Sequence, residues 1–392
     1  MPERSTTEAN HLKFLRLALF AGFIVTGMVT TLLGPVLPVF IARWNLTDSQ
    51  AGLFFTTQFS GSMLGVVLSS VILSLRGYRD SLVLGFLLMA AGVAGLNSSS
   101  QHVALFATAV SGFGFGLAIP ATNLCIAEIS GARRAAALTL LNMAWGVGAI
   151  VCPILLLAGL KISRFTTALL GISLAALLLT ILFATVKFDS LAAAATSRET
   201  VAQNSAEHRH PLHVPIALAL LFYLYVGTEG GISGWAAEAA HRIGSGAAYT
   251  IVPTFFWAGL LTGRGISALL VSRVKENLFV ICGLLLAALG ATCLLLADDR
   301  PRVILGVLLA GFGLAGVYPI FISWLSKWYG ERARRLGGVM FSMAALGGAT
   351  VPWTVGFVSQ HAHSLRIGLL VPLAGCFAML ILVAALRNRI TA

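Results

Sequence analysis

The sequence is poor in charge, since only 10% of its 392 residues are Asp, Glu, Lys or Arg, whereas 58% are hydrophobic. A soluble domain usually carries about 25% charged residues. The charges that are present separate apolar runs of about 20 residues, the length of a helix that spans a bilayer. This distribution argues against a soluble globular protein and indicates a helical membrane protein that crosses the lipid bilayer many times.

The sequence also lacks the motifs of enzymes and of nucleic-acid-binding proteins. Its five cysteines fall inside apolar runs without the paired spacing of a metal site. The glycine-rich runs 112–116 and 311–316 lie inside apolar spans and have no following Lys-Ser/Thr, so they are not phosphate-binding loops. The net charge of +12 is spread over short loops rather than gathered in a basic stripe. We therefore expect no cofactor, no metal, no nucleic-acid partner and no enzymatic activity.

Apolar runs bounded by charged or Gly/Asn/Ser clusters predict an all-α membrane protein with twelve transmembrane helices in two sets of six. Proline is expected to kink or break several of them. The prolines within spans are Pro35, Pro38, Pro120, Pro153, Pro253, Pro319 and Pro352. The spans are predicted near residues 17–42, 49–75, 81–97, 102–128, 136–160, 166–187, 213–240, 247–272, 278–297, 302–327, 335–360 and 365–387.

One long polar connection joins the two sets and is predicted to be a linker. The segment from Met1 to His11 is polar and is predicted to be disordered. The predicted parts of the chain are a cytoplasmic leader (1–16), an N-terminal six-helix half (17–187), a cytoplasmic linker (188–212), a C-terminal six-helix half (213–387) and a cytoplasmic tail (388–392).

An internal repeat relates the halves. An offset of 199 residues places Gly112-Phe113-Gly114 on Gly311-Phe312-Gly313 and Pro120 on Pro319. The same offset matches the pairs Gly131/Gly330, Arg133/Arg332, Gly148/Gly347 and Pro153/Pro352. Because each repeat holds an even number of helices, both halves have the same orientation, and the repeats are parallel. Lys and Arg are concentrated in the loops that share a side with both termini, which predicts cytoplasmic termini.

This pattern of six plus six helices with a long central loop resembles the major facilitator superfamily. In that superfamily the loop after the second helix carries a Gly and an Asp-Arg pair, and here Arg76-Gly77-Tyr78-Arg79 keeps the Gly and an Arg without the Asp. The resemblance implies a secondary transporter with a central cavity. It also implies a monomer in a bacterial inner (plasma) membrane.

Within the superfamily, the sequence is similar to the fucose and glucose permease group of sugar:cation symporters. The similarity rests on Tyr225-Val226-Gly227-Thr228-Glu229 with Trp235, on Gly263-Arg264, on the segment 46–52 and on Leu141-Asn142. The chain departs from the fucose symporter by lacking its acidic residues in helices 1 and 4, where Gly34 and a residue among Leu117, Ile119 and Pro120 stand.

Glu229 is the main candidate for ion coupling, because a carboxylate in the middle of a membrane helix is costly and usually lines a pathway. It could accept hydroxyl hydrogens from a solute or bind and release a proton. The alternative is a structural pair or a hydrogen bond between helices. Polar and aromatic side chains at similar depth complete a predicted solute site, each with helix–helix contact as the alternative role. The predicted substrate-binding residues are Gln58, Asn123, Asn142, Trp145, Tyr225, Glu229, Trp235, Trp257 and Tyr318.

A cytoplasmic gate is predicted from Glu128, Arg264 and Lys327. Arg264 lies deep in its span, and an ion pair with Glu128 or Glu331 would compensate its burial. The repeat places Glu128 and Lys327 at equivalent positions with opposite charges, which suggests either a latch or two solvated helix ends.

The predicted function is secondary transport of a small polar solute, preferably a monosaccharide, by alternating access with proton or sodium symport. The alternative is an efflux antiporter for amphipathic drugs or metabolites. Helix 5 of such antiporters carries a Gly and a Gly-Pro pattern, of which Gly148 and Pro153 remain while Cys152 replaces the second Gly. A receptor would need an added soluble domain, and the short loops leave little room for one.

Overall fold

The computed structural model describes residues 6–161, 164–186, 188, 212–244, 246–270 and 273–386, and every regular element within them is a helix. The predicted linker, apart from its two end residues, and the predicted tail lie outside the described residues. Ten helices of the described part are long and apolar enough to cross a membrane. The predicted all-α membrane fold is therefore confirmed.

The first part of the chain contains seven of the described elements. They are α1 (Thr6–Thr31), α2 (Leu33–Trp44), α3 (Asp48–Gly95), α4 (Gln101–Ser130), the 3-10 helix η1 (Gly131–Arg133), α5 (Arg134–Lys161) and α6 (Phe165–Thr185).

The second part contains the remaining described elements. They are α8 (His213–Ile243), η2 (Ala247–Ile251), α9 (Val252–Leu270), α10 (Glu276–Leu295), α11 (Arg300–Leu314), α12 (Val317–Tyr329), η3 (Gly330–Arg332), α13 (Ala333–His361), α14 (Leu365–Gly368) and α15 (Leu370–Ala385).

The long helix α3 contains two predicted spans. Gly77 interrupts it with φ 78° and ψ −171°, a conformation that favours glycine, and the chain turns there between residues 49–75 and 81–97. The predicted span at 247–272 corresponds to η2 and α9. α9 is not among the ten apolar candidates, because Arg264 and several Gly, Thr and Pro residues lower its hydropathy. Counting both parts of α3 and adding α9 gives the twelve predicted spans within the described residues.

Proline breaks two of the predicted spans. The first span divides at Leu32 into α1 and α2, and the tenth divides at Ala315–Gly316 into α11 and α12. Pro35 and Pro319 stand just after these breaks, where the missing N–H and the proline ring prevent the usual bond to the carbonyl four residues earlier. Pro120, Pro153 and Pro352 instead lie inside continuous helices, and Pro253 lies in the first turn of α9.

The predicted disorder of the leader is wrong from Thr6 onward. α1 begins at Thr6 and continues into the first membrane span. Because the membrane helix that follows is already formed, each added turn at its N-terminal end needs no new nucleation. A polar extension of this helix therefore costs little free energy.

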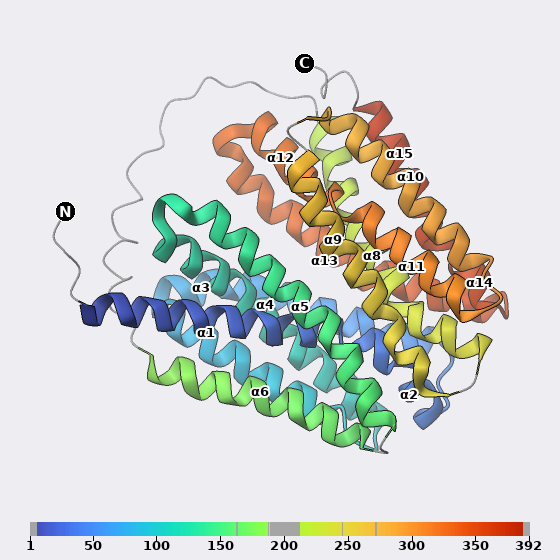
Figure 1. Cartoon of the computed structure of the whole chain (residues 1–392), viewed down its shortest axis with the longest axis horizontal. Coiled ribbons are helices and arrows are strands. Elements are labelled where there is room, and N and C mark those ends of the chain that lie inside the picture. The colour runs from blue at the N-terminus through green and yellow to red at the C-terminus, as the bar shows by residue number, and fades with distance from the viewer. Residues whose placement is uncertain are drawn as a thin grey trace. The chain divides into compact units, whose positions relative to one another are not determined.

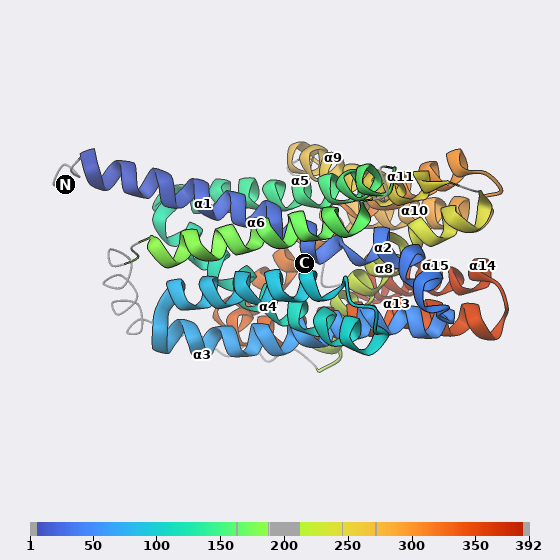
Figure 2. The same ribbon diagram turned by 90° about the horizontal axis from the view of Figure 1, so that it is seen from below.

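Contacts within the chain divide its described residues into two compact units. Among the described residues, the first comprises 6–31, 60–152, 164–186 and 188, and the second comprises 32–59, 153–161, 212–244, 246–270 and 273–386. In the first, α1 packs on α4 and α6, and in the second, α8 packs on α13 while α10 and α9 flank α11 (Figures 1 and 2). The second unit includes α2 and the beginning of α3 because α2 packs directly on α8.

The two halves repeat their packing at equivalent glycines. A side chain at Gly148 would collide with the Ile24 carbonyl, and one at Gly347 would collide with the Tyr223 carbonyl. All four positions are related by the same 199-residue offset. In both halves, therefore, a glycine at the equivalent position allows two helices to pack closely.

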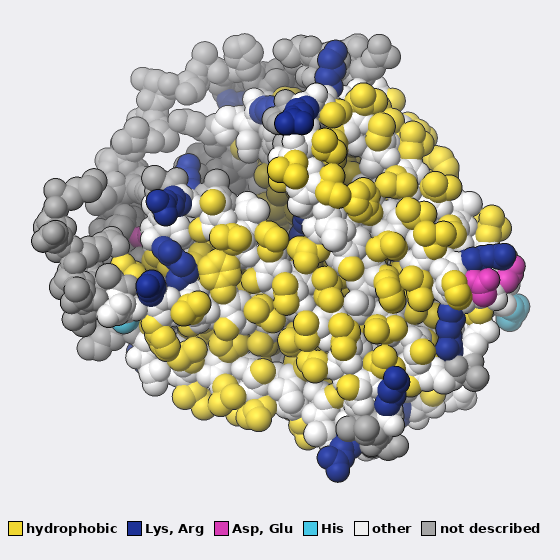
Figure 3. Space-filling view, viewed as in Figure 1, with side chains coloured by type: hydrophobic (Ala, Val, Ile, Leu, Met, Phe, Trp, Pro, Cys, Tyr) yellow, Lys and Arg dark blue, Asp and Glu magenta, His cyan; other side chains and the backbone are white. Residues whose placement is uncertain are grey.

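The helix ends repeat as well. Gly131 and Gly330 adopt φ 51° and 50°, and each is followed by a 3-10 turn before the next helix. The side chains on the outside of the helices are mostly hydrophobic, with charged groups gathered near the margins of the face shown in Figure 3. This distribution is the one expected for helices that face lipid.

Candidate functional site

Glu229 lies near the middle of α8, in a stretch rich in glycine. A side chain at Gly34 of α2 would approach the Ser233 carbonyl to 2.9 Å, and one at Gly227 would collide with Val351 of α13. Small residues on these faces therefore let α2 and α13 approach α8 closely. Glu229 is partly exposed, whereas Gly227, Thr228 and Gly231 beside it are buried.

The carboxylate of Glu229 interacts electrostatically with the guanidinium of Arg264 on α9. Tyr225, one turn earlier on α8, interacts electrostatically with both groups. Opposite charges that attract each other compensate part of the cost of removing each from water. The pair is a finding of the tertiary structure, because the sequence analysis assigned Arg264 an inner-end partner. Of those expected partners, the side chain of Glu331 lies outside the described residues.

Two tyrosines interact electrostatically with Glu229 and Arg264. The rings of Tyr225 and Tyr318 have centroids 5.0 Å apart, and the Tyr225 hydroxyl donates to the Leu314 carbonyl at 3.1 Å. Tyr318 stands in the second residue of α12, directly after the break caused by Pro319. Tyr318 also interacts electrostatically with Glu229 and Arg264. The break between α11 and α12 thus presents a carbonyl and an aromatic side chain to the same small region.

One polar atom of this region is unsatisfied. The Nε atom of Arg264 is buried and has no hydrogen-bond partner among the described protein atoms. A buried N–H without an acceptor is costly, so it favours a bound molecule that supplies one. The Glu229 carboxylate accepts hydrogen bonds, and the tyrosine hydroxyls both donate and accept them. The site can therefore bind an uncharged molecule that carries several hydroxyl groups.

Three other predicted site residues lie in the same compact unit. Gln58, at the beginning of α3, is buried and has polar or ring contacts. Trp257 of α9 is buried against Phe256, with ring centroids 5.1 Å apart. Trp235 is fully buried and its indole N–H donates to the Pro352 carbonyl at 2.8 Å, which satisfies its polar atom. Trp235 therefore has a packing role in this structure, and its contact with solute stays a prediction.

The remaining predicted residues, Asn123, Asn142 and Trp145, belong to the first compact unit. The amide groups of Asn123 and Asn142 donate to carbonyls of their own helices, Ile119 at 2.9 Å and Leu138 at 2.8 Å. Their Oδ1 atoms remain acceptors in these arrangements. The participation of all three in one site with Glu229 stays a prediction.

The predicted gate residues Glu128 and Lys327 each have a local partner. Glu128 accepts a hydrogen bond from the Tyr78 hydroxyl at 2.7 Å, within the first unit. Lys327 pairs with Glu276 at 2.5 Å, within the second. Glu128 and Lys327 are equivalent in the repeat, but their partners are not, because the offset places Tyr78 on Asn277 rather than on Glu276. The direct contact predicted between Glu128 and Lys327 on the inner side stays a prediction.

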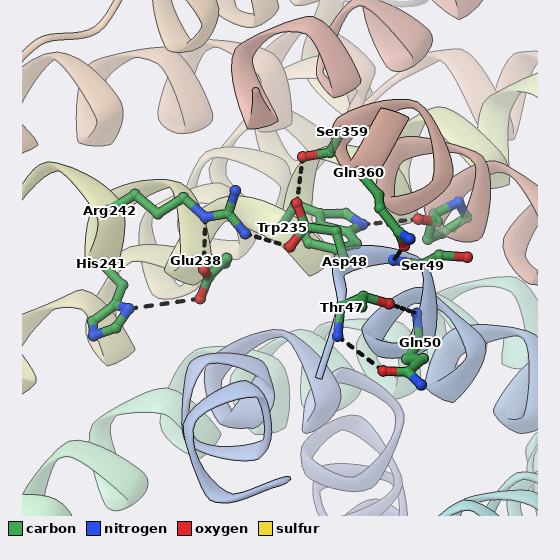
Figure 4. Close-up of polar contacts among 11 residues, drawn as sticks. Thr47, Asp48, Ser49, Gln50, Trp235, Glu238, His241, Arg242, Ser359 and Gln360 are labelled. Atoms are coloured by element: carbon green, nitrogen blue, oxygen red, sulfur yellow. Dashed lines mark hydrogen bonds and ion pairs between the residues drawn. The ribbon is translucent and has the colours of Figure 1, made fainter. Parts of the chain in front are cut away.

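A polar cluster that was not predicted from the sequence lies at the other end of α8 (Figure 4). Arg242 donates to Glu238 at 2.7 Å through its Nε atom and to Asp48 through Nη2. Asp48 also accepts from the Ser359 hydroxyl, and His241 lies 3.7 Å from Glu238. One feature of the sequence could have indicated this cluster: Glu238 and Arg242 are four residues apart, which places an acid and a base on adjacent turns of one helix.

Local sequence positions Asp48 in this cluster. Thr47 and Gln50 form a reciprocal capping box, in which each side chain accepts from the backbone N–H of the other residue, at 2.9 and 3.3 Å. The backbone N–H of Ser49 donates to Gln360 of α13 at 3.2 Å. These contacts fix the first turn of α3 against α8 and α13.

Comparisons with known proteins agree with this architecture. A family model described as the Major Facilitator Superfamily matches residues 19–237. The chain is 24% identical over 383 residues to the putative glucose/galactose transporter of Helicobacter pylori strain J99, covering 90% of this chain and 91% of that protein.

Solved structures of the same kind are similar to this one. The fucose:proton symporter FucP of E. coli gives a TM-score of 0.60 at 18% identity, over 95% of this chain and 98% of that one. A POT family transporter in complex with 5-aminolevulinic acid gives 0.76 at 14% identity, over 96% of each chain. Identities this low indicate a shared fold alone.

Proposed function

This chain belongs to the Major Facilitator Superfamily, a family of transporters and not of enzymes, and on that premise we propose that it carries a monosaccharide by alternating access, coupled to symport of a proton or a sodium ion. The observation that carries the proposal is the electrostatic attraction between Glu229 and Arg264, with which Tyr225 and Tyr318 also interact. This group of residues combines charge, hydroxyl groups and aromatic rings in the interior of a membrane helix bundle.

An uncharged solute suits this group of residues better than an ion. Because Glu229 and Arg264 neutralise each other, an added charge in the solute would be buried without a counter-ion. A sugar hydroxyl can donate to Glu229 and accept from the unsatisfied Nε–H of Arg264. The aromatic face of Tyr318 suits the apolar side of a sugar ring. The similarity to a putative glucose/galactose transporter supports the same choice of solute.

Coupling is proposed to act through Glu229. A proton on its carboxylate removes the attraction to Arg264 and frees the guanidinium for the solute. The bound proton and the bound sugar then favour the same arrangement of the site, which is the requirement for symport. A sodium ion beside the carboxylate would compete with Arg264 in the same way.

The proposal also includes the other predictions made from the sequence. The nine predicted substrate-binding residues line the pathway, Glu128, Arg264 and Lys327 act at the cytoplasmic gate, and the protein functions as a monomer. It resides in a bacterial inner membrane with both termini cytoplasmic, in agreement with the distribution of Lys and Arg.

The proposal is tested by uptake into proteoliposomes of purified protein. The panel contains monosaccharides, and proton and sodium gradients are imposed separately on wild type and on Glu229→Gln. We expect gradient-driven accumulation of at least one sugar by the wild type. The Glu229→Gln variant should lose accumulation against a gradient while retaining exchange of labelled for unlabelled sugar, because the amide still hydrogen-bonds but does not take up a proton or pair with a cation.

The matched control is Asp298→Asn, which removes an exposed carboxylate that pairs with Arg366. It should accumulate sugar as the wild type does. Transport of amphipathic dyes without any sugar would favour the efflux antiporter instead. Undiminished accumulation by Glu229→Gln would remove Glu229 from the coupling mechanism while leaving sugar transport intact.

A further inference from the structure

The polar cluster at the end of α8 joins three separate segments of the second compact unit. Asp48 begins α3, Arg242 belongs to α8 and Ser359 to α13, and both of the latter donate to the Asp48 carboxylate (Figure 4). The Asp48 carbonyl also lies against Gly356, where any side chain would collide with it. We call the contacts of Asp48 with Arg242 and Ser359 the latch. The bias of Lys and Arg assigns this end of α8 to the outside.

Glu238 is the buried member of the cluster. Its side chain is 4% exposed, and its Oε1 accepts from Arg242. Its Oε2 is buried and has no hydrogen-bond partner among the described residues. A buried carboxylate oxygen without a donor is a position where a proton can bind, because the neutral acid avoids the cost of an unsolvated charge.

The two carboxylates share one guanidinium, which donates to Glu238 through Nε and to Asp48 through Nη2. Glu238 precedes Arg242 by one turn on the same helix, so this contact can persist whatever the position of α3. The contact with Asp48 exists only while the beginning of α3 lies against α8. When Glu238 is ionised, Arg242 retains a partner even if Asp48 leaves. When Glu238 is protonated, Asp48 is the carboxylate that remains for Arg242.

We propose that Glu238 is a proton-binding site that controls the latch, so that protonation from the outside holds the outer end of the protein closed. This inference concerns different residues from the solute site and does not depend on which solute is carried. A proton loaded from outside would thereby favour closure at that side.

Four titratable or charged groups face Glu238 from its own helix and from the elements packed on it: Asp48, His241, Arg242 and Tyr249. Arg242 stays charged, and a phenol such as Tyr249 stays neutral below about pH 9. His241 is 42% exposed on its side chain, so it connects Glu238 with outside water. His241 is itself ionisable, so its contribution has to be separated from that of Glu238.

The test measures opening of the outer end without any solute. Spin labels are attached to Ala42→Cys and His361→Cys, on α2 and α13, in full-length protein in nanodiscs with the exposed Cys282 and the half-buried Cys293 replaced by Ser. Double electron–electron resonance then gives the distance distribution at several values between about pH 5 and pH 8.

Acidification of the wild type should increase the short-distance population. Glu238→Gln should show the acid-like distribution at every pH, with the ratio of closed to open populations at pH 8 raised by about fivefold or more. Asp48→Asn should shift the distribution to longer distances, because it removes the latch itself. His241→Gln should keep the response to pH.

The control Asp298→Asn makes the same change of charge at an exposed site among other ion pairs. It should leave the distribution and its response to pH unchanged. The inference is overturned if Glu238→Gln responds to pH as the wild type does or moves to longer distances. Loss of the response in His241→Gln would also overturn it, and this result remains available if Glu238→Gln does not fold.

Discussion

At the scale of residues, the electrostatic attraction between Glu229 and Arg264 helps to explain how two charges are tolerated inside a membrane helix bundle. Neither residue has a charged equivalent in the other half of the repeat, where Thr30 and Gly65 stand. Each compensates the other, and neither is well placed without its partner. Removal of one member of a buried ion pair leaves an unpaired charge, at a cost of about 3–5 kcal/mol, and the cost is smaller here because Glu229 is partly exposed.

Arg264→Ala should therefore lower the melting temperature of the detergent-solubilised protein strongly. The double variant Arg264→Ala/Glu229→Gln should recover most of the loss, because it leaves no charge behind. Thermal unfolding followed by size-exclusion chromatography measures both. Arg302→Ala, which removes an exposed pair with Asp298, should change the stability by less than about 1 kcal/mol. Equal losses in the single and double variants would show that Glu229 does not depend on Arg264 for its stability.

At the scale of elements, glycine and proline determine how the helices approach one another and where they break. The contacts of Gly148 with Ile24 and of Gly347 with Tyr223 bring helices together at equivalent places in the two halves. Pro35 and Pro319 free backbone carbonyls where helices divide. Broken helices within membranes occur where other protein groups or a cavity satisfy the freed atoms. The break beside Tyr318 accordingly lies next to the Glu229 site.

Gly347→Val should destabilise the packing of α13 on α8, because its side chain would collide with the Tyr223 carbonyl, which belongs to the backbone and cannot rotate away. Overpacking of this kind costs about 1–3 kcal/mol or more. The loss is measured as a lower melting temperature. Gly171→Val is the matched control, since nothing lies within 4 Å of a side chain there. Similar melting temperatures for the two variants would contradict the close contact at Gly347.

At the scale of the whole molecule, the chain is an integral membrane protein with many spans, and its two sets of helices repeat the same pattern. Equivalent glycines at 131 and 330 end equivalent helices with nearly the same backbone angles. The mean hydropathy of +0.91 and the apolar surfaces of the helices require lipid around them. Orientation in the membrane follows from the loops, in which the positive charges are unequally distributed.

Reporter fusions test this orientation in a bacterial host. Alkaline phosphatase fused after Ser98, in the loop between α3 and α4, should be active, because that loop is expected outside. The same enzyme fused after Ala392 should be inactive, whereas green fluorescent protein at that position should fluoresce. Active phosphatase at Ala392 would reverse the expected orientation and would place the Asp48 cluster on the cytoplasmic side.

Most of the fold could be predicted from the sequence because its causes are local. Apolar runs long enough to span a bilayer define helices one at a time, and a constant offset between Gly, Pro and Arg positions defines the repeat. The reversal at Gly77 and the break before Pro35 also follow from single residues. The helical start at Thr6 was not predicted, because a polar sequence does not show whether a neighbouring helix will extend into it.

The sequence by itself determined that this protein is helical, lies in a membrane, is built from two related halves and carries a costly acid at Glu229, since each of these depends on composition, spacing or transfer from water to lipid. Only the tertiary structure decided the partners. It brought Arg264 to Glu229, Glu276 to Lys327, and Asp48 to Arg242. Ion pairs between segments distant in the chain depend on which helix faces touch, and that choice results from the packing of many small residues together rather than from any one of them.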